Sequence, residues 1–121
     1  MWSCHYERRY RMAKKWFVEL KEKVIGQHPM CWICNHRFAT DLHHALVKDA
    51  KRHHRVLTVE INMMPVCQVC HVSLEQTANT HEIKNRFAAS QLRRGFDIAS
   101  WYQSLPLKVK EHWLLHYGEI R

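Results

Sequence analysis

The sequence predicts an α+β fold that is mostly helical, and three observations predict it. Apolar residues recur every three or four positions near the amino terminus and again after residue 79, as in helices that bury one face. Residues 31–71 lack this period and contain short β-branched and apolar runs instead. Two Cys-x-x-Cys pairs enclose that middle part. The chain has 121 residues and no low-complexity linker, so we expect a single domain over residues 1–121.

The first predicted element is a basic amphipathic helix over residues 5–25. Gly26 and Pro29 are expected to end it. Its apolar face consists of Tyr6, Tyr10, Ala13, Phe17, Leu20 and Val24, and its other face carries Arg8, Arg9, Arg11, Lys14, Lys15, Lys21 and Lys23. The basic face is either solvated surface or a contact for phosphate groups, and the pattern favours neither.

Two short strands and a helix are predicted in the middle of the chain. Arg37–Leu46 and Val56–Asn62 have the composition of half-buried strands, with a polar, basic loop between them. Pro65 is expected to interrupt the chain before a helix that begins near Gln68.

Residues 79–121 are predicted to be helical. A helix capped near residue 80 is expected to run to Arg94, followed by a short helix containing Trp101 and a last helix containing Trp113. These two tryptophans are either part of the core or part of a homodimer face, and a core position is the more frequent one for tryptophan.

The two cysteine pairs predict a structural zinc site. Cys31, Cys34, Cys67 and Cys70 offer the four thiolates of a tetrahedral zinc centre, while Cys4 is left over as a free thiol. Two disulfides are the alternative. The amino terminus is charged at once and lacks the apolar stretch of a signal peptide, so we expect a reducing, cytoplasmic location rather than secretion. No apolar run approaches membrane-spanning length, and no membrane partner is expected.

Basic residues outnumber acidic ones. Lys plus Arg number 19 against 11 Asp plus Glu, a formal net charge of +8. This balance favours a polyanionic partner, of which nucleic acid is the commonest, although some proteins are basic without binding one. The residues best placed to contact DNA phosphates lie in the loop between the predicted strands: Lys48, Lys51, Arg52 and Arg55. Arg86, Arg93 and Arg94 are suited to extend that contact.

Histidines and an asparagine lie between and directly after the cysteine pairs. Asp41-Leu42-His43-His44 is followed by Glu60-Ile61-Asn62-Met63-Met64-Pro65-Val66-Cys67-Gln68-Val69-Cys70-His71. This order resembles the HNH endonuclease family, whose fold is the ββα-metal unit, also called the His-Me finger. The resemblance covers roughly residues 31–78 and does not extend to the flanking helices.

The resemblance implies a metal-dependent endonuclease that hydrolyses phosphodiester bonds of double-stranded DNA, by nicking or by double-strand cleavage. It implies that His44 is the general base that activates water and that Asn62 holds the loop between the histidines. It also implies that His43 and His71 hold a catalytic Mg²⁺, Mn²⁺ or Ni²⁺ ion distinct from the zinc. Glu75, one helical turn after His71, is a weaker candidate ligand, because glutamate is usually a solvated residue.

Several points stay open at the level of sequence. Adjacent strand residues point to opposite faces, so His43 and His44 can serve one site only where the strand ends or bends. Asn35 stands where the family commonly has glycine. A non-catalytic zinc-stapled nucleic-acid-binding protein, or a protein-interaction module with an inactive HNH fold, would also carry these thiols. Homing, phage packaging and restriction are all compatible roles.

Overall fold

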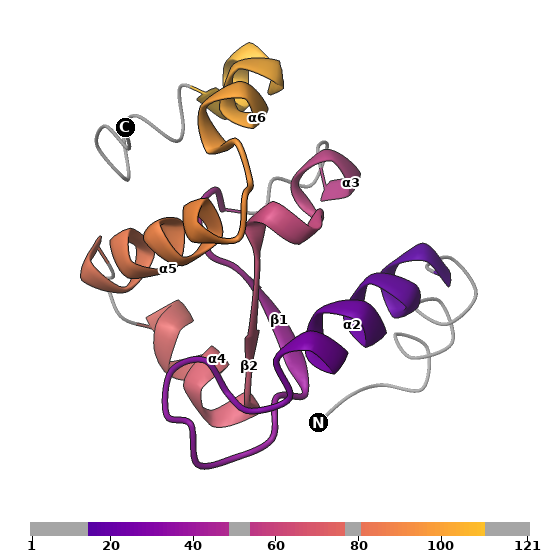
Figure 1. The fold of residues 1–121 in the computed structure, drawn as a ribbon, viewed down its shortest axis with the longest axis vertical. Helices are drawn as coiled ribbons and strands as arrows, with labels where there is room; N and C mark the ends of the chain where they lie inside the picture. Colours follow the sequence, from indigo (N-terminus) through magenta and orange to yellow (C-terminus); the bar gives the residue numbers. More distant parts are fainter. Residues whose placement is uncertain (1–14, 49–53, 77–80, 111–121) are drawn as a thin grey trace.

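The computed structural model describes residues 15–48, 54–76 and 81–110 (Figure 1). The described elements in chain order are α2 (Lys15–Gln27), β1 (Asp41–His44), α3 (His54–Leu57), the 3₁₀ turn η2 (Glu60–Asn62), β2 (Met63–Val66), α4 (Gln68–Gln76), α5 (His81–Arg93) and α6 (Ile98–Ser104). The predicted α+β architecture with mostly helical content is therefore confirmed for the described residues.

The sheet consists of β1 and β2, which pair in antiparallel fashion. His43 lies opposite Met64, and His44 lies opposite Met63. In Figure 1, α2 lies on one side of these strands, and α4 and α5 lie on the other. Helices that are far apart in the sequence therefore lie beside the same short sheet.

The predicted strands are only partly correct. The extended segment expected at Arg37–Leu46 forms a regular strand only at Asp41–His44. The strand expected at Val56–Asn62 is wrong, because these residues form the end of α3 and the turn η2. Leu57 and Ile61 are buried by this turning of the chain rather than by strand alternation. The second strand follows directly, at Met63–Val66.

Pro65 lies inside β2 instead of interrupting the chain before the helix. It pairs with Leu42 across the sheet. Proline has no N–H to donate, so it can take part in backbone pairing only as an acceptor. Its carbonyl accepts a hydrogen bond from the N–H of Trp32 at 2.9 Å, which ties the first cysteine pair to the sheet.

The helices agree better with the sequence pattern. α2 continues two residues past the expected end at residue 25, and residues 5–14 of the predicted helix lie outside the described part of the chain. α4 begins at Gln68, as predicted. α5 ends at Arg93, one residue before the expected end. Trp101 lies in α6 and packs partly buried against the core, whereas Trp113 lies outside the described residues.

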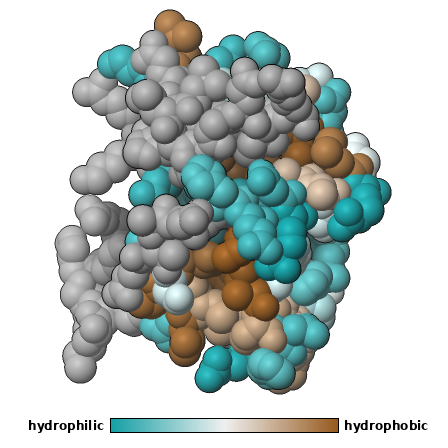
Figure 2. Space-filling view, turned by 90° about the vertical axis from the view of Figure 1, so that its left-hand side faces the viewer, coloured by the Kyte–Doolittle hydropathy of each residue, from teal (hydrophilic) through white to brown (hydrophobic). Residues whose placement is uncertain are grey.

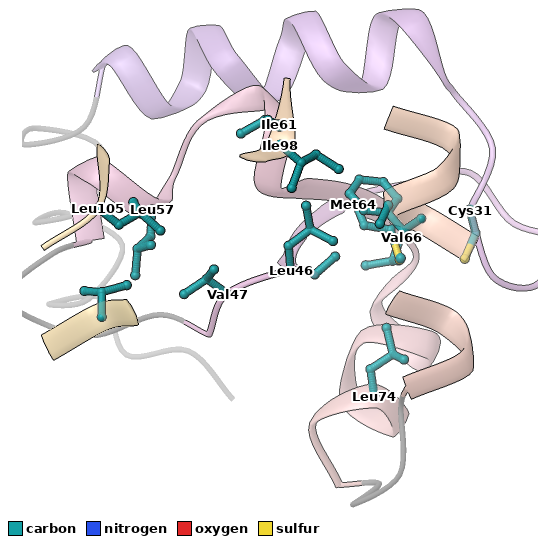
Figure 3. Close-up of a cluster of buried hydrophobic side chains, with 14 of the residues drawn as sticks. Cys31, Leu46, Val47, Leu57, Ile61, Met64, Val66, Leu74, Ile98 and Leu105 are labelled. Atoms are coloured by element: carbon teal, nitrogen blue, oxygen red, sulfur yellow. The ribbon is translucent and has the colours of Figure 1, made fainter. Parts of the chain in front are cut away.

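Two groups of buried side chains hold the elements together. The larger one draws on β2, on the residues that follow β1, and on α4, α5 and α6 (Figure 3). Its fully buried members include Leu46, Val47, Leu57, Met64 and Val66. The smaller group lies under α2 and consists of Phe17, Val24, Leu42 and Met63. Burial of one such aliphatic side chain stabilises a fold by about 1.5–3 kcal/mol.

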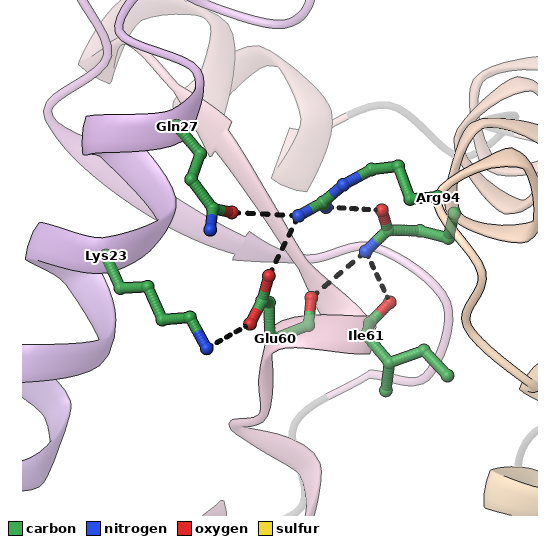
Figure 4. A network of polar contacts seen from close by, with 6 residues as sticks. Lys23, Gln27, Glu60, Ile61 and Arg94 are labelled. Atoms are coloured by element: carbon green, nitrogen blue, oxygen red, sulfur yellow. Dashed lines mark hydrogen bonds and ion pairs between the residues drawn. The ribbon is translucent and has the colours of Figure 1, made fainter.

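A polar network joins α2 and α5 to η2 (Figure 4). Glu60 forms ion pairs with Lys23 and Arg94, each at 2.8 Å. Arg94 also donates to the side-chain oxygens of Gln27 and Gln91, at 2.8 and 2.7 Å. We call these five residues the Glu60 clamp. Arg94, which we expected to extend a DNA contact, therefore has its charge matched within the protein.

Figure 2 shows the side of the molecule that lies on the left in Figure 1. Hydrophobic residues on this side lie between hydrophilic ones. Among the described residues, no helix has the length and apolar character needed to span a membrane.

Candidate functional site

The four cysteines of the two Cys-x-x-Cys pairs lie together. The sulfur atoms of Cys31, Cys34, Cys67 and Cys70 are all within 4.8 Å of one another, and those of Cys34 and Cys67 are 4.0 Å apart. Zinc–sulfur bonds of about 2.3 Å in a tetrahedron place sulfurs about 3.8 Å apart. The cluster could therefore hold a metal ion such as zinc with little movement.

The first cysteine pair lies on a tight turn that Asn35 makes possible. Asn35 has a φ of 55°, in the left-handed region, and its N–H donates to the carbonyl of Cys31 at 3.0 Å. Asparagine tolerates this conformation better than other residues with a side chain. Asn35 can therefore form this turn although it is not a glycine. The next N–H, of His36, points at the sulfur of Cys34 at 3.5 Å.

The second cysteine pair opens α4. The N–H of Cys70 points at the sulfur of Cys67 at 3.5 Å, and the N–H of His71 donates to the carbonyl of Cys67 at 2.9 Å. The backbone N–H groups of His36 and Arg37 lower the pKa of Cys34 to about 6. Burial raises the pKa of Cys70 to about 12, and the neighbouring thiols add to the effect. Crowded thiols of this kind lose their last protons when a cation binds among them.

His43 of β1 and His71 of α4 lie side by side. Their ring centroids are 5.4 Å apart and their planes are nearly perpendicular, at 73°. Burial and, to a smaller extent, the positive charges of His71, His44, Lys84 and Lys48 together lower the pKa of His43 to about 3. His43 is therefore neutral at physiological pH, which is the form of imidazole that binds metal ions.

Two carboxylates approach the imidazole of His71. Asp41 Oδ2 lies 3.1 Å from Nδ1, and Glu75 Oε1 lies 3.2 Å from Nε2. Asp41 begins β1 and Glu75 lies one turn further along α4, so strand and helix both contribute. In the described part of the chain, only the four cysteines bring three or more ligand atoms within 4.8 Å of one another. His43, His71 and Glu75 do not form a second group of that kind.

His44 is the last residue of β1. Its Nε2 lies 2.9 Å from Oγ1 of the buried residue Thr58. The N–H of Ala45 still donates to the carbonyl of Asn62 at 2.9 Å, and the next two N–H groups, of Leu46 and Val47, donate to the Asn62 side chain instead of to β2. The ring of His44 is close enough for its charged form to lower the pKa of His43.

Asn62 is completely buried and holds the chain that follows β1. Its Oδ1 accepts hydrogen bonds from the N–H groups of Leu46 and Val47, at 2.8 and 2.9 Å. Its Nδ2 donates to the carbonyls of Val47 and Leu57, both at 2.9 Å. An amide side chain has two donors and two strong acceptor positions, so every one of them is used. Both ends of the loop between His44 and Thr58 are fixed to this one side chain.

The predicted DNA-contacting residues divide into two groups. Lys48 and Arg55 are exposed. The Arg55 guanidinium carbon lies 3.9 Å from the ring centroid of Trp16 in α2. Lys51 and Arg52 lie outside the described residues.

Lys84 of α5 is a residue that the sequence interpretation missed. Only 8% of it is exposed, and its charge acts on His43. Burial lowers the pKa of Lys84 to about 8, and the charge of Lys48 adds to this effect. The sequence feature that could have revealed its burial is its position one helical turn before Phe87 and Ala88, on the buried face of α5.

Comparison with known proteins gives no match to any family model, curated protein or solved structure.

Proposed function

We propose that this protein is a metal-dependent DNA endonuclease of the HNH type, in which β1, β2 and α4 form a ββα-metal unit. The observation that carries the proposal is the pairing of His43 with His71 across the strand–helix contact. The four hydrogen bonds of Asn62, which fix the loop after His44, support it. The excess of basic residues suits a polyanionic substrate.

His43 and His71 are the proposed ligands of a catalytic divalent ion, whose chemistry would be Lewis-acid stabilisation of charge on the phosphate. Glu75 is a further candidate. When Nδ1–H of His71 donates to Asp41, Nε2 carries a lone pair that faces a carboxylate oxygen of Glu75 at 3.2 Å. Two lone pairs at that distance repel each other unless a proton or a cation lies between them, so a bound divalent ion would relieve this repulsion.

His44 is the proposed general base. When its Nε2–H donates to Thr58, its Nδ1 carries the lone pair that accepts a proton from water. The resulting hydroxide forms a new bond to phosphorus, and one P–O ester bond breaks. The departing oxygen takes its proton from solvent. Thr58 thus holds the ring orientation on which this role depends.

The four cysteines are proposed to hold a structural zinc ion that takes no part in cleavage. They join the turn before β1 to the start of α4, and His71 follows Cys70 directly. The zinc would therefore fix the end of the helix from which the proposed catalytic ligand projects.

A non-catalytic zinc-stapled nucleic-acid-binding protein is the second candidate. One observation favours it: the thiol cluster is complete, whereas the histidines do not gather three ligand atoms in the described residues. In that case the basic surface would bind DNA, and no metal would add cleavage.

Plasmid nicking tests the choice. The zinc-loaded full-length protein is incubated with supercoiled plasmid in Mg²⁺, Mn²⁺ or Ni²⁺, beside an EDTA control. We expect nicking that depends on the added ion and that His44→Ala abolishes while zinc content is kept. The exposed His81 provides the matched control, and His81→Ala should nick like the wild type. Wild-type protein that binds DNA and zinc but never nicks would establish the non-catalytic alternative.

A further inference from the structure

Trp16 and Arg55 form a stacked pair between two elements that are distant in sequence. The guanidinium carbon of Arg55, in α3, lies 3.9 Å from the ring centroid of Trp16, near the start of α2. Trp16 is itself held in place. It packs against the smaller core group and meets the ring of Phe17 edge-on, with centroids 6.0 Å apart. Arg55 therefore rests on a fixed platform.

Stacking leaves the hydrogen-bonding edge of Arg55 available. A guanidinium that lies face-on to an aromatic ring keeps its in-plane N–H donors, and these match the oxygens of a phosphate. Arg55 is exposed, and no carboxylate of the described residues pairs with it. Its orientation is already restricted, so binding a phosphate costs less side-chain entropy than it would for a free arginine.

The position of Arg55 relates it to the proposed general base. It lies three residues before Thr58, whose hydroxyl contacts His44. Two other cations beside α2, Lys23 and Arg94, are both paired with Glu60. Arg55 is thus a cation presented to solvent on the same short segment that holds His44.

We propose that Trp16 is a positioning residue for nucleic acid: it holds the Arg55 guanidinium in the orientation that binds a backbone phosphate of duplex DNA. On this view α2, which lies outside the segment resembling the HNH family, forms part of the DNA interface. The inference rests on the proposed function only in taking DNA as the partner, and it requires no cleavage.

A double-mutant cycle on DNA binding tests it. Binding of the zinc-loaded full chain to a short labelled duplex is measured at several salt concentrations, without a catalytic ion and in the His44→Ala background. Arg55→Gln should weaken binding about fivefold and lower the salt-dependence slope by about 0.9, the value for one phosphate contact. Trp16→Leu should weaken binding to a similar extent. In the Arg55→Gln background, Trp16→Leu should cause no further loss.

Matched variants separate positioning from general stability. Trp16→Phe keeps an aromatic platform and should retain most of the affinity. Arg86 lies over Trp32 at the longer distance of 5.9 Å and serves as the control arginine. The loss caused by Trp16→Leu should persist unchanged in an Arg86→Gln background. Zinc content and thermal melting of every variant are measured in parallel.

Independent losses for Trp16→Leu and Arg55→Gln would overturn the inference, as would full affinity in Trp16→Leu. If the His44-intact protein nicks plasmid but the cycle shows no coupling, the inference alone fails. If the cycle shows coupling but no metal supports nicking, the inference stands and the endonuclease proposal fails.

Discussion

Nδ1 of His71 lies 3.1 Å from Oδ2 of Asp41, a contact that joins the first residue of β1 to α4. A carboxylate that accepts Nδ1–H fixes the imidazole tautomer and leaves Nε2 as the ligand atom. Partners of this kind commonly change metal affinity by 10- to 100-fold when they are removed.

Replacing Asp41 by asparagine should therefore weaken binding of the catalytic ion about 10-fold or more while leaving zinc bound. Titration of zinc-loaded protein with Mn²⁺, followed by calorimetry, measures the change. Glu82, exposed in the first turn of α5, gives the control variant Glu82→Gln, which should bind Mn²⁺ like the wild type. Equal Mn²⁺ affinity in the Asp41→Asn variant would show that Asp41 does not orient a ligand.

Asn62 should tolerate no replacement. Asn62→Asp keeps the shape of the side chain but loses both N–H donors and places a carboxylate at a fully buried position. Removing one partner from a buried polar network leaves unsatisfied groups, and we expect a loss of about 3 kcal/mol or more in the free energy of unfolding. Urea unfolding measures it. Asn85, exposed in α5, supplies the control Asn85→Asp, which should change stability by less than about 0.5 kcal/mol.

Loss of one thiolate should remove the zinc and the fold together. Zinc binding in small units is worth on the order of 10–16 kcal/mol, so Cys67→Ser is expected to lose bound zinc and the cooperative thermal transition. The His44→Ala variant should keep both. Metal analysis and circular dichroism of the two variants provide the measurement. A Cys67→Ser protein that melts like the wild type would mean that the thiol cluster does not hold the fold.

The Glu60 clamp should make stability fall at acid pH. Burial alone raises the pKa of Glu60, but the hydrogen bonds and charges of Lys23 and Arg94 outweigh it, so the pKa lies below its ordinary 4.5. The stabilisation is present above that value and is lost as pH falls through the folded-state pKa. Glu60→Gln should cost about 1–2 kcal/mol at pH 7, and this difference from the wild type should shrink in acid. Glu22→Gln on the exposed side of α2 is the control.

Lys84 should give the opposite dependence on pH. Its pKa is about 8 in the folded chain, against an ordinary value of 10.5. Between these values the unfolded chain holds a proton that the folded chain has released, so the free energy of unfolding rises with pH. Relative to Lys84→Met, wild-type stability should therefore rise by about 1–3 kcal/mol across this window. A difference that is constant with pH would contradict the buried position of the amine, and Lys108→Met, at an exposed position, is the control variant.

Helical period and cysteine spacing predicted most of what the structure contains. α4, α5 and α6 lie where their apolar spacing, caps and glycine place them, because these signals are local. The grouping of the four thiols was predicted from the two Cys-x-x-Cys spacings, which are typical of a zinc site. The roles of His43, His44, Asn62 and His71 in catalysis remain predictions that rest on the resemblance.

The position of the second strand could not be predicted from the local sequence pattern. Val56, Val59 and Ile61 have strand composition, yet their stretch folds as a short helix and a turn. Asn62 decides between the two outcomes, because its side chain binds carbonyls and N–H groups that only a folded-back loop can present. Lys84 was missed for a related reason: the sequence shows a charge, whereas the burial of that charge arises from helix packing.

Hydrogen bonds and an ion pair between the end of α5 and η2 determine which residues the chain needs in order to fold. Gln91 donates to the carbonyls of Glu60 and Ile61, at 3.0 and 3.1 Å, and Arg94 binds the Glu60 carboxylate. A fragment that stopped after α4 would lose the Gln91 donor to both carbonyls, would leave the Glu60 carboxylate paired with Lys23 alone, and would uncover the core that Phe87 closes. The strand–strand–helix unit is therefore not a self-sufficient cassette. Its transplantation into another protein would require the helix that follows, at least as far as Arg94.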